Sequence, residues 1–428
     1  MTDLKTFNPF DPEALQCPFP HYAQMREEQP VLLLESMGMY LVTRHDLVLK
    51  VIRDVETYSS EFGVSSGGFS GEARDRMAEV VADGYPRVST MLTADMPDHT
   101  RYRRLVSKAF TPKVIAELEP VIRSITTRLL DAWFDGRSDD APIELEFVER
   151  FGVPLPVEVI AHALNVPDER LVDFKRWSDD SIAGIGTNIT LDQRIEAERG
   201  VNEFQHYFAD QLEQRKLAPQ DDLLTNLLNA RVDDDDPDIT DKRPLDMPEM
   251  LSIVQQLLVA GNETTTKLLT ETVRLLAENP DQWQALQDDP GRAPAVVEEA
   301  LRLSTPTQGM FRISTRDHEL EGVRIPKGAQ MLILFASANR DPELFGEPDA
   351  FDPDRDNLRD HLAFGKGIHF CLGAALSRLE GKVALEEFTR RVERFELADS
   401  NEFDYFPSFM LRGLKRLDVE VTPKVAER

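Results

Sequence analysis

Between residues 98 and 303 the sequence consists almost entirely of helical patterns, and this feature constrains the fold more than any other. Apolar residues recur there at the three- and four-residue spacing of amphipathic helices. The predicted helices are 21–28, 46–54, 98–110, 113–134, 156–164, 168–182, 191–215, 221–230, 247–278, 281–288, 292–303 and 372–391. The predicted strands are 31–34, 39–43, 311–315, 323–325, 329–335, 394–397 and 416–421.

The helical pattern runs without an interruption that would mark a domain boundary. No Gly/Ser-rich linker and no internal repeat divides the 428 residues, so we expect residues 1–428 to form a single domain. The expected fold class is mainly α, with a large helical core at about 98–303 and small antiparallel β-sheets at one side. The N-terminal part at about 30–60 is expected to be richer in strands.

The charge balance excludes one class of function. The chain carries 77 acidic and 49 basic side chains, a formal net charge of −28. A phosphate-binding surface needs a basic stripe, so we expect no nucleic-acid binding. Part of the acid lies in 233–238, which we expect to be a solvated loop rather than a metal site.

The sequence also bears on location. The apolar runs are too short for a membrane span, and the N-terminal residues resemble no secretory signal. Two cysteines far apart make no disulfide framework, and Cys17 is expected to be an incidental thiol. We therefore expect a cytoplasmic protein.

The second cysteine, Cys371, lies in the segment Phe-Gly-Lys-Gly-Ile-His-Phe-Cys-Leu-Gly at 364–373, directly before a predicted helix. A thiol at a helix N-terminus meets free backbone N–H groups and the positive end of the helix dipole. Both lower its pKa, which suits a thiolate that ligates a metal. The alternative is a buried free cysteine at a glycine-rich turn.

The predicted helix at 247–278 has a polar break at Ala-Gly-Asn-Glu-Thr-Thr-Thr, residues 260–266. A glycine weakens a helix interior by about 1 kcal/mol relative to alanine. A threonine can bond back to the i−4 carbonyl and bend the helix. A small residue also lets a large group approach the backbone. The alternative is an exposed polar turn of an ordinary amphipathic helix.

Both segments resemble the cytochrome P450 monooxygenases. The first matches their haem-binding loop at Phe364, Gly367, His369, Cys371 and Gly373, and the second matches their oxygen-binding helix. The resemblance implies that Cys371 is the proximal thiolate ligand of the haem iron. It implies a proton-delivering role for Glu263 and Thr264. The cofactor-binding residues implied in these two segments are Phe364, Gly365, Gly373, Ala260 and Gly261.

Other positions match the family's cationic and structural residues. His99 and Arg103, at i and i+4, project from one face of their predicted helix. The resemblance implies that they, with Arg312 and His369, bind the haem propionates. It also implies a buried network of Glu299, Arg302 and Arg355 that shapes the cysteine loop without catalysing.

The implied function is a haem-thiolate monooxygenase that uses haem b and O2. Its two electrons would come ultimately from NAD(P)H, through a ferredoxin and ferredoxin reductase in trans. It would hydroxylate or epoxidise a hydrophobic small molecule such as a terpenoid, steroid, fatty acid or aromatic. The alternatives are a peroxide-driven peroxygenase and a non-catalytic haem-binding sensor. The Glu263–Thr264 pair counts against both.

The resemblance also suggests where substrate and partner bind. Pocket residues would come from 64–92 and 176–190, and from Gln256, Val259, Ala260, Thr307, Gly309, Met310, Phe409 and Met410. On the helix at 98–110, Arg101, Arg104 and Lys108 lie toward the polar face. Arg104 and Lys108, with Lys366 and Arg378, could form a basic patch for an acidic ferredoxin. The alternative is that these are scattered surface cations.

Overall fold

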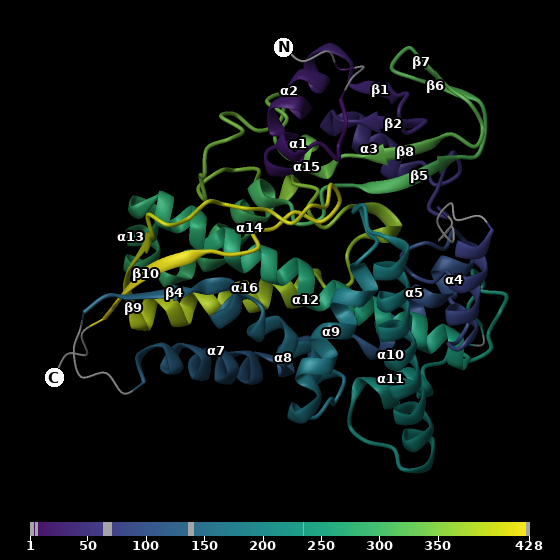
Figure 1. The fold of residues 1–428 in the computed structure, drawn as a ribbon, viewed down its shortest axis with the longest axis horizontal. Helices are drawn as coiled ribbons and strands as arrows, with labels where there is room; N and C mark the ends of the chain where they lie inside the picture. The colour runs from purple at the N-terminus through teal and green to yellow at the C-terminus, as the bar shows by residue number, and fades with distance from the viewer. Residues whose placement is uncertain (1–3, 5–6, 63–70, 136–140, 234, 425–428) are drawn as a thin grey trace.

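The computed structural model describes residue 4 and residues 7–62, 71–135, 141–233 and 235–424. Its described part is mainly helical, as predicted, with small sheets at the edges (Figure 1). The helices are α1 (Pro12–Gln16), α2 (Phe19–Glu28), α3 (His45–Arg53), α4 (Glu72–Ala82), α5 (Asp98–Ala109), α6 (Pro112–Glu117), α7 (Glu119–Phe134), α8 (Pro154–Ala163), α9 (Leu171–Ile182), α10 (Leu191–Leu217), α11 (Leu223–Asn229), α12 (Met247–Glu278), α13 (Pro280–Asp288), α14 (Ala293–Ser304), α15 (Phe335–Ala338) and α16 (Ala374–Arg391).

The strands form three sheets. They are β1 (Val31–Leu34), β2 (Met39–Val42), β3 (Tyr58–Ser59), β4 (Ile143–Glu146), β5 (Met310–Ser314), β6 (His318–Leu320), β7 (Val323–Ile325), β8 (Gln330–Ile333), β9 (Val392–Leu397) and β10 (Asp418–Pro423). The sheet orders are β1-β2-β8-β5-β3, β4-β10-β9 and β6-β7. The largest sheet lies at one end of the molecule with α1–α3 (Figure 1, top).

One sheet departs from the predicted antiparallel pairing. β2 and β8 run parallel, with Met39 opposite Gln330 and Val42 opposite Ile333. A parallel pair cannot be closed by a hairpin and needs a long crossover between its strands. Here most of the helical core lies between β2 and β8 in the chain, so the order along the sequence did not reveal the pairing.

Several boundaries also differ from the prediction. The predicted helix at 113–134 is two helices, because Pro120 stands in the first turn of α7, where its missing N–H costs nothing. The predicted strand at 329–335 ends at Ile333, and α15 follows. Helix α4 was predicted only as part of a pocket loop, and the short strands β3, β4 and β6 were not predicted. The part of the predicted 64–92 pocket region at 64–70 lies outside the described residues.

Helix α12 occupies the predicted range and passes through the centre of the molecule, where it contacts α8, α9, α14 and α16 (Figure 1). A capping box begins it. The Asp246 side chain accepts from the Glu249 N–H at 3.0 Å, and the Glu249 carboxylate accepts from the Asp246 N–H at 2.9 Å. The helix ends at Glu278, two residues before Pro280.

Arg101 does not lie on an exposed face as predicted. It is buried, with its guanidinium 2.9 Å from Glu249, which Arg243 and Tyr102 also contact. Burial alone would raise the pKa of Glu249, but Arg243 and Arg101 lower it to about 2. This ion pair joins α5 to the first turn of α12.

Among the described residues, no helix combines the length and apolar character that crossing a bilayer would require. The single-domain organisation stays a prediction.

We expect Glu249→Ala to lower the free energy of unfolding by roughly 3–5 kcal/mol, because it removes the closest carboxylate from the buried Arg101 guanidinium and leaves it with Asp241 at 3.4 Å. Thermal and denaturant unfolding would measure this change. The stability that ionised Glu249 contributes should be complete above its ordinary pKa of 4.5 and be lost as the pH falls toward 2.

Glu196→Ala is the matched control, since Glu196 pairs with Arg199 while their side chains remain 74% and 62% exposed. It should cost about 1 kcal/mol or less. Equal losses in the two variants would contradict the assigned role of Glu249.

Candidate active site

The Cys371 loop is a tight turn that ends where α16 begins. Gly365 and Gly367 have φ of 63° and 70°, a backbone conformation that a side chain would strain. The Cys371 N–H donates to the Phe364 carbonyl at 2.9 Å and closes the loop. Phe370, directly before the cysteine, is 38% exposed, which is unusual for a large aromatic side chain.

The predicted lowering of the Cys371 pKa is wrong in net direction. Burial raises the pKa of the thiol, although the N–H groups of Gly373 and Ala374 and the charges of Arg103 and Arg378 act to lower it. The helix N-terminus is therefore in place but is outweighed by desolvation. Holding this sulfur as a thiolate at neutral pH requires a strong positive partner, and a bound metal ion supplies one.

Basic side chains from three separate elements converge beside this loop. The rings of His99 on α5 and His369 in the loop lie 4.3 Å apart between centroids. The Arg103 guanidinium donates to the Phe370 carbonyl at 2.7 Å, and Arg312 on β5 donates to the Phe311 carbonyl at 2.7 Å. Asp95 is the carboxylate that partly balances this cluster.

The electrostatics of this cluster fit an anionic ligand. Burial lowers the pKa of His99 to about 4, with Arg103 adding to the effect, and lowers that of Arg312 to about 10. In the described part of the chain, the buried His99 Nε2 has no hydrogen-bond partner. A ligand with carboxylates would satisfy this nitrogen and neutralise the buried positive charge.

The polar break of α12 has the geometry that its sequence predicted. The Thr264 hydroxyl donates to the Ala260 carbonyl, four residues earlier, at 2.9 Å. Ala260 is exposed, whereas Leu257 and Leu258 one turn earlier are buried, so open space lies beside this turn. The Thr265 hydroxyl donates to Ser377 Oγ at 3.3 Å, which joins this turn to α16.

Gly261 has a different neighbour from the one predicted. A Cβ at this position would lie 3.1 Å from Ile160 Cγ1 on α8. Close packing between α8 and α12 therefore limits the size of the residue at this position. The neighbour of Gly373 is the cysteine itself, because a Cβ at Gly373 would lie 4.0 Å from the Cys371 sulfur.

Glu263 is buried and ionised. Its carboxylate lies 2.8 Å from Lys267 Nζ and 3.2 Å from Lys175 Nζ. Burial alone would raise the pKa of Glu263, but the two lysines lower it to about 2. Sequence reasoning missed both lysines. The i, i+4 spacing of Glu263 and Lys267 could have revealed the first, whereas Lys175 on α9 is brought in only by the tertiary fold.

The three predicted structural residues are in direct contact. Arg302 lies 2.7 Å from Glu299, and both side chains are fully buried, while Arg355 lies 2.9 Å from the same carboxylate. Arg302 also donates to the carbonyls of Asn339, Pro348 and Ala350. The side chain of Asn339 in turn accepts from the Leu362 N–H at 2.6 Å, just before the Cys371 loop.

The predicted pocket residues fall into two groups. Thr307 pairs with Leu411 across an isolated bridge, so the 307–310 and 409–410 segments lie side by side. The Gln256 amide donates to Thr90 at 2.7 Å, which brings α12 to the end of the 64–92 segment.

The other predicted pocket residues differ in their surroundings. Met410 is buried in an apolar cluster with N-terminal residues, which places it in a core. Strand β8 leaves no room for a side chain at Gly309, since a Cβ there would collide with the Ile333 carbonyl. Val259 is half-buried and Met310 begins β5.

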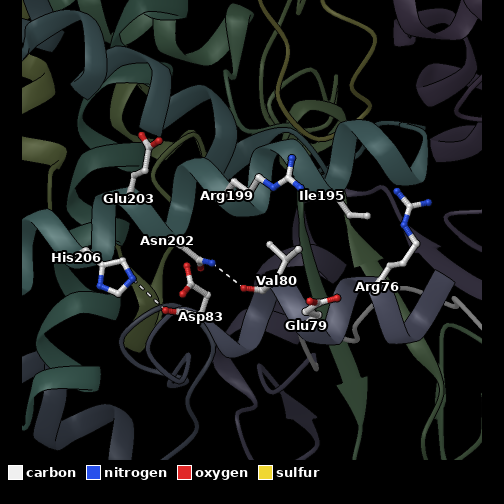
Figure 2. A pocket seen from close by; sticks show the side chains of 9 residues that line it. All are labelled: Arg76, Glu79, Val80, Asp83, Ile195, Arg199, Asn202, Glu203 and His206. Atoms are coloured by element: carbon white, nitrogen blue, oxygen red, sulfur yellow. Dashed lines mark hydrogen bonds between the residues drawn. The ribbon is translucent and has the colours of Figure 1, made fainter. Parts of the chain in front are cut away.

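A polar surface groove of about 510 Å³ lies between α4 and α10 (Figure 2). Asn202 donates to the Val80 carbonyl at 2.7 Å, and His206 bonds the Asp83 carbonyl at 3.0 Å, so the groove joins the two helices. Both acidic and basic side chains line it, which does not suit an apolar substrate. Arg76, Glu79, Val80 and Asp83 belong to the predicted 64–92 pocket segment, whereas the individually predicted site residues do not line this groove.

Arg103 of the cationic cluster contacts the cysteine loop, and the polar break is joined to α16, so these residues could hold a thiolate-ligated haem. The cytochrome P450 family model matches residues 191–412. The chain is 35% identical to Cytochrome P450 109 of Bacillus spizizenii, over 95% of this chain and 92% of the relative. It is 36% identical to the erythromycin C-12 hydroxylase of Saccharopolyspora erythraea, over 92% of each chain.

A solved structure agrees with these sequence matches. The fold is similar to that of CYP109Q5 from Chondromyces apiculatus, with 37% identity and a TM-score of 0.84 over 99% of this chain and 100% of the other. The chain belongs to the cytochrome P450 family. It is a P450 monooxygenase, and the family implies the use of haem and O2.

Replacing Cys371 with serine should abolish the red-shifted absorption band of the reduced, carbon monoxide-bound enzyme, because serine cannot supply the thiolate. Absorption spectra of the two proteins at equal haem content measure this. Cys17→Ser is the control, since Cys17 is exposed, and it should keep the band. Persistence of the band in Cys371→Ser would refute the ligand assignment.

Proposed function

We propose that this enzyme binds haem b and uses O2 and two electrons to hydroxylate or epoxidise a hydrophobic small molecule. The observation that carries the proposal is a group of cationic and donor side chains beside a cysteine loop that ends at a helix N-terminus: the buried Arg312, Arg103, and the buried His99 Nε2 that has no partner among the described residues. Such a cluster fits a ligand that carries carboxylate groups and a metal ion that a thiolate can coordinate.

In this proposal each part of the site holds one part of the cofactor. Cys371 would ligate the iron, and His99, Arg103, Arg312 and His369 would bind the propionates. Phe364, Gly365 and Gly373 would shape the loop around the metal, and Ala260 would face the porphyrin. The bound haem supplies the iron at which O2 is activated, with the thiolate raising its electron density.

The polar break of α12 is proposed to deliver protons. The Thr264 hydroxyl donates a hydrogen bond to the carbonyl of Ala260, a residue that is exposed on the helix surface. That hydroxyl can rotate to accept or donate a proton, and Glu263 lies next to it in the chain. A peroxide-driven enzyme or a non-catalytic sensor has no need of this pair.

The substrate is proposed to be apolar, and steroids are the first compounds to test. Val259, Met310 and Ala260 supply apolar surface, and a P450 structure at 32% identity contains corticosterone. A fatty acyl chain is the next class, because another relative at 30% identity holds a hexadecenoic acid carried by an acyl carrier protein. Terpenoids and aromatics complete the panel for spin-state titration.

Thr264→Ala should lower product formed per electron consumed by about tenfold, with hydrogen peroxide accounting for the difference, because proton delivery depends on the hydroxyl. Parallel assays of product, electron consumption and peroxide measure this. Thr264→Ser keeps a hydroxyl and should remain coupled. Full coupling in Thr264→Ala would refute the relay. Turnover with peroxide alone would favour the peroxygenase, and no turnover would favour the sensor.

The electron donor is proposed to be a ferredoxin, supplied by a reductase that uses NAD(P)H. We also propose a cytoplasmic location, where the Cys371 thiol stays reduced before haem binds. The four cations suggested as a docking patch differ in their surroundings, and this changes which of them a ferredoxin could use.

Asp233, Asp236 and Asp238 of the acidic segment pair with two of those cations and are not simply solvated. Lys108 lies 2.6 Å from Asp233, and Arg104 contacts Asp236 and lies 2.8 Å from Asp238. A third cation, Arg378, bonds Glu298 at 2.6 Å and stacks over Phe364. Lys366 donates to the Arg359 carbonyl at 3.4 Å and is half-buried. Lys366 is therefore the cation of this set best placed to meet an acidic partner.

Lys366→Glu should slow the first electron transfer from ferredoxin several-fold at low ionic strength, since complementary charge steers association. Asp233→Asn should speed it, because it releases Lys108. Stopped-flow reduction across a salt series measures both effects, which should vanish at high salt.

Lys327→Glu makes the same charge change in an exposed turn next to β8 and should alter nothing. Substrate spin-state titration should be unchanged in all three variants. Equal slowing by Lys327→Glu would show that net charge acts, and that this patch does not.

A further inference from the structure

Both oxygens of the Glu263 carboxylate are held by ammonium groups. Lys267 Nζ lies 2.8 Å from Oε2, and Lys175 Nζ lies 3.2 Å from Oε1. Glu263 is 7% exposed and Lys267 is 4% exposed. The carboxylate therefore has two charged partners in a place that water hardly reaches, where such contacts are strongest.

The neighbouring hydroxyl is bonded elsewhere. Thr264 follows Glu263 in the chain, and successive residues point about 100° apart around a helix. Thr264 donates to the Ala260 carbonyl, one turn back. Acid and alcohol are thus adjacent in sequence, yet each is held by a different partner.

The two lysines hold Glu263 in different ways. Lys175 on α9 has a side chain that is 27% exposed and shares its ammonium with Asp179, so it lies at the solvent end. Lys267 is enclosed by the C-terminal segment. Its Nζ lies 5.6 Å from the Phe406 ring centroid, and a Cβ at Gly413 would collide with its stem. The fold makes room for the Lys267 side chain and leaves it little freedom.

We propose that Lys267 is a positioning residue that holds the Glu263 carboxylate away from Thr264 and so limits the rate of proton delivery to that hydroxyl. The inference rests on the proposed function, because Lys267 would slow the proton delivery by Glu263 and Thr264 proposed above. The charged groups that face Glu263 are Lys267 on its own helix, and Lys175 and Asp179 on α9. Asp179 shares Lys175 and also interacts directly with the Glu263 carboxyl group.

The physical basis is a balance between burial and charge. Burial favours the protonated form of Glu263, and the lysines favour the ionised form by more. Removing the Lys267 ammonium leaves the burial in place, and the remaining ammonium, Lys175, is shared with Asp179. The carboxyl group then takes up a proton more readily and turns more freely toward its neighbour.

The direct test is an infrared titration of Glu263 in the substrate-free holoenzyme, with Glu263→Gln used to identify the carboxylate band. In Lys267→Gln the protonation midpoint should rise by about one pH unit or more. Lys267→Arg keeps the charge and should stay close to the wild-type midpoint. Lys175→Gln removes the solvent-side partner and should shift the midpoint less than Lys267→Gln. An unchanged midpoint in Lys267→Gln would overturn the inference.

A kinetic double-mutant cycle tests whether Lys267 acts through Glu263. Lys267→Gln should raise the rate of product formation about threefold and reduce its solvent deuterium isotope effect. In the Glu263→Gln background the same change should have no effect. An equal effect in both backgrounds would show a general structural role and overturn the inference.

Two further readouts separate the possible failures. If Glu263→Gln leaves the rate of product formation unchanged, the proton relay in the proposed function is wrong, and the role inferred for Lys267 is wrong as well. If Glu263→Gln is slow but Lys267→Gln changes neither midpoint nor rate, only the Lys267 inference fails. Thermal unfolding shows whether each variant is folded, and Lys267→Arg supplies the comparison if Lys267→Gln is not.

Discussion

The buried pair of Glu299 and Arg302 is the interaction on which the active-site architecture depends. Both side chains are completely inaccessible to water. A buried ion pair recovers its desolvation cost only when its remaining hydrogen-bonding groups are satisfied. Here Arg355 and three backbone carbonyls do this, and those carbonyls belong to the 339–350 segment. Through Asn339 the network reaches Leu362, so the position of the Cys371 loop is set from behind by α14.

Helix α12 shows how a central helix can carry polar groups at modest cost. Its Glu263 is neutralised by two lysines, and the hydroxyls of Thr264, Thr270 and Thr272 bond to carbonyls one turn back. Gly261 allows α8 to pack closely, so the weak point in the helix coincides with tight support from a neighbour. This support explains how the helix stays continuous from Met247 to Glu278 while its middle remains open on one side.

Burial decides the electrostatics at both ends of the site. At Cys371 burial outweighs a helix N-terminus and two arginines. At His99 burial favours the neutral ring, and at Arg312 it leaves a charged guanidinium that Asp95 balances in part. A protein with an excess of acid has thus placed partly balanced positive charge inside and acidic side chains around its surface cations.

The sequence alone determined the features that depend on local order. The Cys371 motif, the range of α12, the back-bond of Thr264 and the common face of His99 and Arg103 follow from spacing along a few turns of chain. Helical periodicity is a property of neighbouring residues, and so it can be read without the fold.

The tertiary structure decided the features that depend on distant segments. It set the parallel pairing of β2 and β8, the burial of Arg101 against Glu249, the contact of Lys175 with Glu263 and the pairing of Arg104 with Asp236. It also reversed the expected effect on the Cys371 thiol, because desolvation depends on everything packed around a group. Residues far apart in the chain meet only after folding, and no local pattern records which of them will meet.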